Sequence, residues 1–371
     1  MALADFISKF DLRLCMQCGV CTGSCPLTIR SSLNMRRLIN EFVMDGGKLT
    51  GEHPELWDCT TCLTCRSRCP RGVEILDLIT GLRSSILEAG RVPPTLRDAL
   101  ENVYKHGNPW GKSRAKRVEW ISGLKIKKLE EGVKADNVLF TCCASAYDTR
   151  AQKATIALVQ SLEKLNVNLG TLGEAETCCG NEVYNMGETG LFELLSEENA
   201  DRLNKYEVPV ITTSPHCYNA FKNRYKGIKP AVQHYAQYLA KLVDEDKLKF
   251  NKRVEVIVTY HDPCYLGRHN NVYDEPRKVI ESIPGVKLVE MDRNMRRSLC
   301  CEGGGGRMWY EGPPGTRLSE LRILEALDVN ANILITTCPF CLANFEDAVK
   351  TVGKEEQLKV MDLAELVIQA L

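Results

Sequence analysis

Apolar residues recur at helical spacing twice in the first ninety residues. Between residues 33 and 44 they occupy positions 35, 38, 39, 42 and 43, and this spacing predicts a helix. A second helix is predicted over residues 73–89, and both apolar stripes are expected to form core. The pair Pro93-Pro94 and a turn cluster at 107–111 then interrupt the pattern, which predicts a connector over residues 91–132.

From about residue 134 the pattern changes. Short apolar runs predict strands at 138–140, 167–172 and 208–213, and helical spacing predicts helices at 151–165 and 191–205. Strands that alternate with helices are typical of parallel α/β layers, whose ligands gather beyond the carboxyl ends of the strands. We therefore expect an α/β fold in which a mostly helical amino-terminal part precedes the sheets.

The second half of the chain repeats the first. Residues 211–217 align with 335–341, and the pair Cys178-Cys179 aligns with Cys300-Cys301. The repeat predicts two tandem α/β units in a pseudo-twofold arrangement, with their cysteine loops at a shared cleft. The expected domains are a helical unit at 1–90, a linker at 91–132, a first α/β copy at 133–250 and a second at 251–371.

Charge and hydropathy exclude several classes of protein. Lysine plus arginine equals aspartate plus glutamate at 48 each, so the basic excess typical of a nucleic-acid-binding protein is missing. No run approaches the eighteen apolar residues that a membrane span needs. The segment Met1–Phe10 is too short and too early charged for a signal peptide. We expect a cytoplasmic protein that reaches a membrane only through a partner.

The cysteines change this picture most. There are 18 in 371 residues, and most stand in Cys-x-x-Cys or Cys-Cys units. This grouping indicates metal ligation in a reducing compartment rather than a disulfide scaffold. Soft thiolates select iron–sulfur clusters, zinc or copper(I).

Two runs share the spacing Cys-x2-Cys-x2-Cys-x3-Cys-Pro. This is the run of bacterial two-cluster ferredoxins, in which the fourth cysteine crosses to the other cluster. A pair of structural zinc sites is the alternative, and two complete runs favour clusters over zinc. We assign one [4Fe–4S] cluster to Cys15, Cys18, Cys21 and Cys69, and the other to Cys59, Cys62, Cys65 and Cys25.

The α/β repeats carry a second kind of cysteine set. Adjacent cysteines cannot easily bridge each other in ordinary disulfide geometry, so a shared cluster explains each Cys-Cys pair better. In the first copy Ser214 stands where the second copy has Cys338. The first copy offers Cys143, Cys178, Cys179 and Cys217, with Cys142 as a stand-in, and the second offers Cys264, Cys300, Cys301, Cys338 and Cys341.

This order of a cysteine, a Cys-Cys pair and a Cys-x-x-Cys resembles the CCG motif of heterodisulfide reductases and of glycolate, glycerol-3-phosphate and lactate dehydrogenase iron–sulfur subunits. The whole chain resembles the D-type component of heterodisulfide reductases, a fusion of the C-type and B-type components. The resemblance implies a non-cubane cluster in the second copy. It favours Cys143 over Cys142, because family sequences usually carry glycine before the first ligand. For the first site it leaves open a cubane, a non-cubane cluster with the Ser214 oxygen, or a decayed scaffold.

The resemblance also implies a function and partners. A flavoprotein similar to the one found in heterodisulfide reductases, or a cytochrome b-type membrane protein, exchanges electrons with the two [4Fe–4S] clusters. The second copy then reduces a disulfide substrate, or runs the reverse thiol oxidation. The alternative is an electron-transfer subunit without a substrate of its own, in a dehydrogenase or an electron-bifurcating complex. No complete dinucleotide fingerprint is present, so flavin or nicotinamide is expected on a partner protein.

Two further features leave alternatives open. His216 and His261 flank cysteine loops, where a histidine can be a ligand, a proton donor or a support that orients the loop, and support is favoured. A locally basic stretch surrounds Trp120, and a solvated helix face is favoured there over a docking surface for an acidic partner. Its members are Lys112, Arg114, Lys116, Arg117, Lys125, Lys127 and Lys128.

Overall fold

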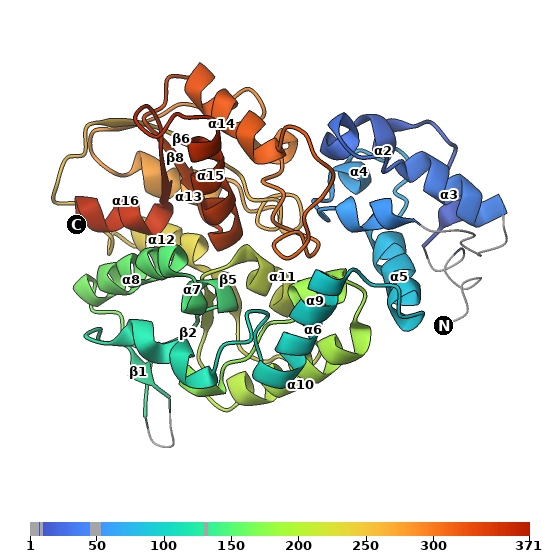
Figure 1. Ribbon diagram of the computed structural model, residues 1–371. Coiled ribbons are helices and arrows are strands. Elements are labelled where there is room, and N and C mark those ends of the chain that lie inside the picture. Colours follow the sequence, from blue (N-terminus) through green and yellow to red (C-terminus); the bar gives the residue numbers. More distant parts are fainter. Residues whose placement is uncertain (1–6, 8–9, 45–52, 130–132) are drawn as a thin grey trace.

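The computed structural model describes residues 7, 10–44, 53–129 and 133–371. Two α/β units lie against each other, and a mostly helical amino-terminal unit packs beside them (Figure 1). The segment Met1–Phe10, which the sequence indicates is not a signal peptide, lies outside the described residues except for residues 7 and 10. Among the described residues, no helix is long and apolar enough to cross a membrane.

The amino-terminal unit contains both of the helices predicted for it. The first, α3, buries Met35, Leu38, Ile39 and Phe42, which belong to the predicted apolar stripe. Each such side chain contributes roughly 1.5–3 kcal/mol when it is removed from water. Within the described residues, the α-helices of this unit are α2 (Val20–Gly23), α3 (Met35–Met44), α4 (Thr64–Ser67) and α5 (Ile75–Glu88).

The connector expected over 91–132 contains regular structure. Pro94 is the first residue of helix α6 (Pro94–His106), because proline lacks only an N–H that the first helical turn leaves unpaired. A 3-10 helix follows at Arg114–Ile121, and strand β1 (Lys127–Lys128) pairs with the first sheet. The connector therefore packs onto the first α/β unit instead of merely joining two domains.

The first α/β unit has a five-stranded sheet in which every pair of neighbours is parallel, with the strand order β1-β3-β2-β4-β5. Besides β1, its strands are β2 (Asn137–Phe140), β3 (Leu169–Thr171), β4 (Val210–Thr212) and β5 (Val232–His234). Its helices are α7 (Cys143–Tyr147), α8 (Thr149–Lys164), α9 (Asn181–Asn185), α10 (Thr189–Asn204), α11 (Pro215–Asn223) and α12 (Tyr235–Asp244).

The second unit repeats this order without an equivalent of β1. Its sheet runs β7-β6-β8-β9, again with parallel neighbours only. The strands are β6 (Val256–Tyr260), β7 (Val286–Leu288), β8 (Ile333–Thr336) and β9 (Lys359–Asp362). The helices are α13 (Asp274–Glu281), α14 (Leu318–Asp328), α15 (Pro339–Thr351) and α16 (Leu363–Ala370). The prediction of a helical unit followed by two tandem parallel α/β units is confirmed.

The two α/β units meet through equivalent helices. Helix α8 packs against α16, and α12 packs against α13. Because α13 is the counterpart of α8 and α16 that of α12, the two contacts are related by a pseudo-twofold axis. Polar contacts cross the same interface, including the Tyr235 hydroxyl on Asp362 Oδ1 at 2.6 Å and Arg150 on Glu365 at 2.7 Å.

Candidate metal centres

The first ferredoxin-type run surrounds one cavity together with a cysteine from the second run. The cavity is lined by Cys15, Cys18, Cys21 and Cys69. Three sulfurs therefore come from one run and the fourth from the other, as the crossed pattern of a two-cluster ferredoxin requires. The structure brings the four residues together, and their role as ligands stays a prediction.

Cys25 lies among the thiols of the second run. Burial and electrostatic repulsion from Cys62 and Cys59 raise the pKa of the Cys25 thiol. Burial and repulsion from Cys59, Cys62 and Cys25 raise the pKa of Cys65 in the same way. Four buried or partly buried thiols that oppose ionisation in this way become thiolates when a cation neutralises them. This donor set fits an iron–sulfur cluster.

In the first α/β unit five thiols meet beyond the carboxyl ends of neighbouring strands. Interactions between neighbouring thiols link them in the series Cys143, Cys178, Cys179, Cys217 and Cys142. The interactions with Cys178 and Cys217 lower the pKa of Cys179 to about 6, although burial opposes its ionisation. The parallel sheet thus places all five where ligands of α/β folds bind.

Cys142 belongs to this cluster of thiols together with Cys143, although the family resemblance favoured Cys143 over Cys142 as the first ligand. Its sulfur contacts Cys217. Its φ of 71° lies in the region that favours glycine. That backbone angle accounts for the glycine which family sequences usually carry at this point, and the structure holds a cysteine in the same conformation.

Ser214, the residue in place of a fifth cysteine, caps a helix. It is the N-cap of α11, and its hydroxyl accepts a hydrogen bond from the His216 amide at 3.3 Å. Cys338, the N-cap of α15, makes no such bond. Serine is a favourable N-cap, so Ser214 contributes about 1 kcal/mol to the stability of α11.

Arg117 lies beside the first thiol cluster. Its guanidinium donates to Cys143 Sγ at 3.1 Å and to Glu176 Oε1 at 2.6 Å, and all three side chains are buried. The local sequence pattern placed Arg117 in a basic surface stretch, and for this residue the surface interpretation is wrong. Arg117 is buried, unlike its exposed basic neighbours, because the 3-10 helix packs on α7, and no local sequence pattern reveals this packing.

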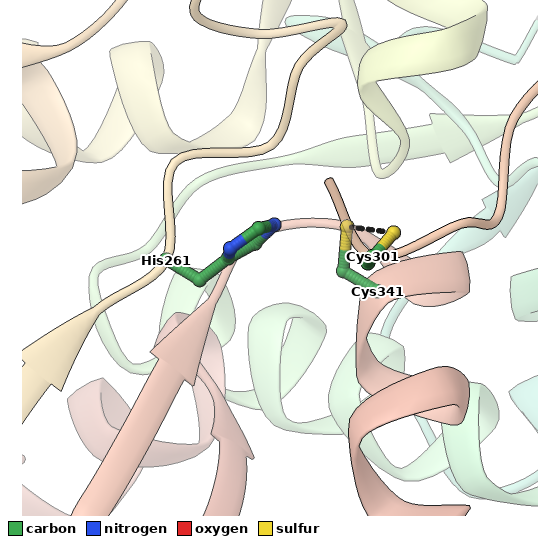
Figure 2. Close-up of side chains that lie close together, drawn as sticks. All are labelled: His261, Cys301 and Cys341. Atoms are coloured by element: carbon green, nitrogen blue, oxygen red, sulfur yellow. Dashed lines mark hydrogen bonds between the residues drawn. The ribbon is translucent and has the colours of Figure 1, made fainter. Parts of the chain in front are cut away.

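The second α/β unit gathers all five of its predicted thiols. A hydrogen bond joins Cys341 to Cys301, and thiol–thiol interactions join Cys264 to Cys300, Cys300 to Cys301 and Cys338 to Cys341. The Cys341 and Cys301 sulfurs are 3.0 Å apart (Figure 2). Hydrogen bonds from neighbouring thiols lower the pKa of Cys301 to about 5 against the effect of burial. No disulfide joins any of the described cysteines, and the five soft donors fit an iron–sulfur cluster.

His216 reaches from the first unit to the second site. Its ring interacts with the Cys338 thiol, and its Nδ1 lies 2.8 Å from Glu182 Oε1. Although burial favours the neutral ring, these two partners raise the pKa of His216 to about 10. Its counterpart Phe340 packs edge-on against the same ring at 4.8 Å. The histidine therefore serves the copy that kept its fifth cysteine, a relationship that the sequence did not reveal.

The helical unit touches the second site directly. The Cys62 thiol interacts with Cys300, which raises the pKa of Cys62, and the Cys300 sulfur lies 3.5 Å from the Thr60 hydroxyl. A Cβ on Gly304 or Gly305 would collide with backbone carbonyls of the Cys59–Thr61 loop. The run of four glycines at 303–306 thus permits close approach between two cysteine loops.

Arg83 locks this junction. It is fully buried and donates to the carbonyl of Cys59 at 2.8 Å, of Asn185 at 2.8 Å and of Gly305 at 3.1 Å. The three carbonyls belong to the helical unit, the first α/β unit and the second α/β unit, respectively. One side chain therefore fixes the three parts around the cysteine loops.

Comparisons with known proteins agree with this arrangement. Residues 137–222 and 258–346 match the cysteine-rich domain CCG, and residues 11–73 match a 4Fe–4S dicluster domain. A solved structure of a hypothetical protein from Helicobacter pylori covers 91% of this chain and 66% of its own length, with a TM-score of 0.57 at 12% identity, which shows similarity of fold.

Curated relatives extend over nearly the whole chain. It is 32% identical to the probable iron–sulfur-binding oxidoreductase FadF of Bacillus subtilis over 97% of this chain and 60% of the relative. It is 36% identical to the EtfAB:quinone oxidoreductase of Syntrophomonas wolfei over 85% of this chain and 46% of the relative. The chain thus spans only about half to three fifths of these two proteins.

A third relative has nearly the same length. The chain is 32% identical to the D-type component of the dihydromethanophenazine:CoB–CoM heterodisulfide reductase of Methanosarcina barkeri, over 98% of this chain and 95% of the relative. With the dicluster unit, the paired cysteine-rich units and this match, the chain belongs to the CCG-domain iron–sulfur oxidoreductases related to the D-type component of heterodisulfide reductases.

Proposed function

We propose that this chain is the iron–sulfur subunit of a heterodisulfide reductase-like complex. A flavoprotein partner supplies electrons to two [4Fe–4S] clusters in the helical unit, which pass them to the second CCG site. A non-cubane cluster held by the five thiols there supplies the redox chemistry that cleaves a disulfide. Each cleavage consumes two electrons and two protons and releases two thiols, and the reverse reaction oxidises two thiols.

The contact between Cys62 and Cys300 carries this proposal. It joins the ferredoxin-type loop of Cys59, Cys62 and Cys65 to the second CCG site without an intervening layer of protein. The second site also has the complete set of five thiols. Electron supply and a cluster suited to sulfur chemistry therefore meet at one buried junction.

The test uses the full chain, purified without oxygen and chemically reduced. The probes are CoB–CoM heterodisulfide and the generic disulfide 5,5′-dithiobis(2-nitrobenzoate), and the readout is reoxidation of the ferredoxin-type clusters. We expect Cys301→Ser to slow reoxidation by more than 100-fold, beyond the 10–100-fold loss typical of a group that supports a ligand. The ferredoxin-type clusters should remain reducible, and Cys143→Ser should retain most activity. Loss of activity in Cys143→Ser alone would place the chemistry in the first unit.

A second candidate is a relay without a substrate of its own. The first unit favours this relay function. Because Ser214 caps a helix in place of the fifth cysteine of the motif, four thiolates of the motif remain at the first site, and four thiolates are the ligand set of an ordinary cubane cluster. The name of the Syntrophomonas relative, a quinone oxidoreductase, is in line with electron transfer between partners. Under this function neither cysteine substitution changes disulfide turnover, because the wild-type protein shows none.

A further inference from the structure

His261 lies buried beside two thiols of the second CCG site. It follows β6, is 1% exposed, and has a ring nitrogen within 4.8 Å of the sulfurs of both Cys301 and Cys341. Figure 2 shows the imidazole directed toward the two sulfurs. One histidine and two cysteines at this spacing are a donor set that a metal could use directly. The hydrogen bonds of the imidazole decide between ligation and another role.

The first unit shows what this position requires for packing. Phe140 and His261 are equivalent positions of the two sheets. Phe140 pairs with Thr212 in the first sheet, and the His261 amide donates to the Ile335 carbonyl at the equivalent register of the second. Phe140 meets Phe221 edge-on at 4.7 Å, and His261 meets the equivalent Phe345 edge-on at 4.6 Å. An aromatic ring without nitrogens therefore packs equally well at this position. The imidazole nitrogens of His261 are not needed for packing and are available for hydrogen bonds.

Arg322 determines which imidazole nitrogen carries the proton. Its Nε donates to His261 Nδ1 at 3.3 Å, and a guanidinium has no acceptor to offer in return. Arg322 is fully buried, and Glu325 at 2.7 Å and the Arg293 carbonyl at 2.8 Å hold it in place. Nδ1 is therefore the acceptor, and in the neutral ring the proton lies on Nε2. Among the described residues, that buried Nε2 has no hydrogen-bond partner.

We propose that His261 donates a hydrogen bond from Nε2 to a sulfur of the cluster held by Cys301 and Cys341, and that it is not a ligand. The inference rests on the proposed cluster at the second site. A ligating Nε2 would need the proton on Nδ1, opposite the N–H of Arg322. A donor at a cluster sulfur stabilises the extra negative charge of the reduced state and so raises the reduction potential. His261 is a positioning residue that tunes the second site and not the first.

The experiment measures the cluster and not only turnover. The full chain is titrated electrochemically, and the signal followed is the electron paramagnetic resonance that disappears in Cys301→Ser. We expect His261→Phe, which restores the aromatic pair of the first unit, to retain iron but lower the potential. The ratio of reduced to oxidised cluster at a fixed potential should fall about tenfold. This corresponds to a reduction potential lower by about 59 mV for a one-electron couple. His261→Gln, whose amide can donate from a similar place, should recover most of the shift.

Two further measurements separate donation from ligation and from packing. Phe345→Leu alters the ring contact but keeps the imidazole, so it should leave the potential nearly unchanged. With 15N-histidine, pulsed resonance should show weak nitrogen coupling, as expected through a hydrogen bond. Strong coupling typical of a metal-bound nitrogen would overturn the inference, and so would an unshifted potential in His261→Phe. Iron limited to the ferredoxin-type clusters in the wild-type chain would overturn the proposed cluster itself.

Discussion

The guanidinium of Arg117 donates a hydrogen bond to Cys143 Sγ over 3.1 Å, and both groups are buried. The same cation neutralises Glu176, so one positive charge faces a carboxylate and a thiol that is suited to bind metal. The 3-10 helix that carries Arg117 lies in the expected connector. The segment before the first sheet therefore contributes to the first CCG site.

Arg117→Met should destabilise the fold by about 3–5 kcal/mol, because it leaves Glu176 as a buried unpaired charge. The double variant with Glu176→Gln should recover part of this loss. In that double variant, any cluster at the first site should show a lower potential, since the donor to Cys143 is missing. Chemical denaturation and redox titration check these outcomes. Lys116→Met, on the exposed face of the same helix, is the control and should change neither quantity.

The crossed ferredoxin arrangement predicts unequal effects from two double substitutions. Cys15→Ser with Cys69→Ser removes two ligands of one cluster, so the chain should lose about four irons. Cys15→Ser with Cys25→Ser removes one ligand from each cluster and should lose about eight. Iron analysis of anaerobically purified protein measures the difference. The reverse order of losses would show that each run binds its own cluster.

Gly304→Ala should slow electron transfer between the helical unit and the second CCG site. Its Cβ would collide with the Thr60 carbonyl, so the two cysteine loops must separate. Iron content should stay unchanged while disulfide-dependent reoxidation falls, as measured by stopped-flow absorbance. Gly23→Ala is the control, because a Cβ there meets no atom within 4 Å. Equal rates in both variants would contradict a direct path through the Thr60 loop.

Ser214→Cys should change the spectrum of the first CCG site and leave disulfide turnover largely intact. The substitution restores the thiol found at Cys338 and removes a helix cap worth about 1 kcal/mol. Resonance spectra and iron content measure the first effect, and thermal unfolding measures the second. Ser214→Ala separates the two, since it loses the cap without adding a thiol. A turnover loss in Ser214→Cys alone would mean that the first site takes part in the chemistry.

Asp362 makes the fold less stable as the pH rises. Burial raises its pKa to about 7, while in the unfolded chain the carboxyl has a pKa of about 3.9. The folded state therefore binds the proton more tightly, and stability falls between about pH 4 and pH 7. Asp362→Asn keeps acceptors for the Tyr235 hydroxyl and the Ala364 amide. Its unfolding temperature should exceed that of the parent by more at pH 8 than at pH 6. The exposed Asp246→Asn should show no such trend.

Much of this protein could be predicted from local sequence, because its determinants are local. The spacing of apolar residues in α3 and the strand runs that became β2 and β4 follow from periodicity alone. The repeat of cysteine loops predicted two equivalent α/β units. Cysteine spacing within each run identified the candidate donors, since a cluster requires sulfurs at fixed distances along a short loop.

Tertiary structure decided which of these groups meet. Arg117 has a surface pattern, yet it is buried against Cys143, because burial depends on how the connector packs on α7. His216 serves the second site from the first unit, and Cys62 reaches Cys300 from the helical unit. These pairs are remote in sequence, and only the docking of three units brings them together. Local sequence thus determined the donors, and packing between units determined their partners.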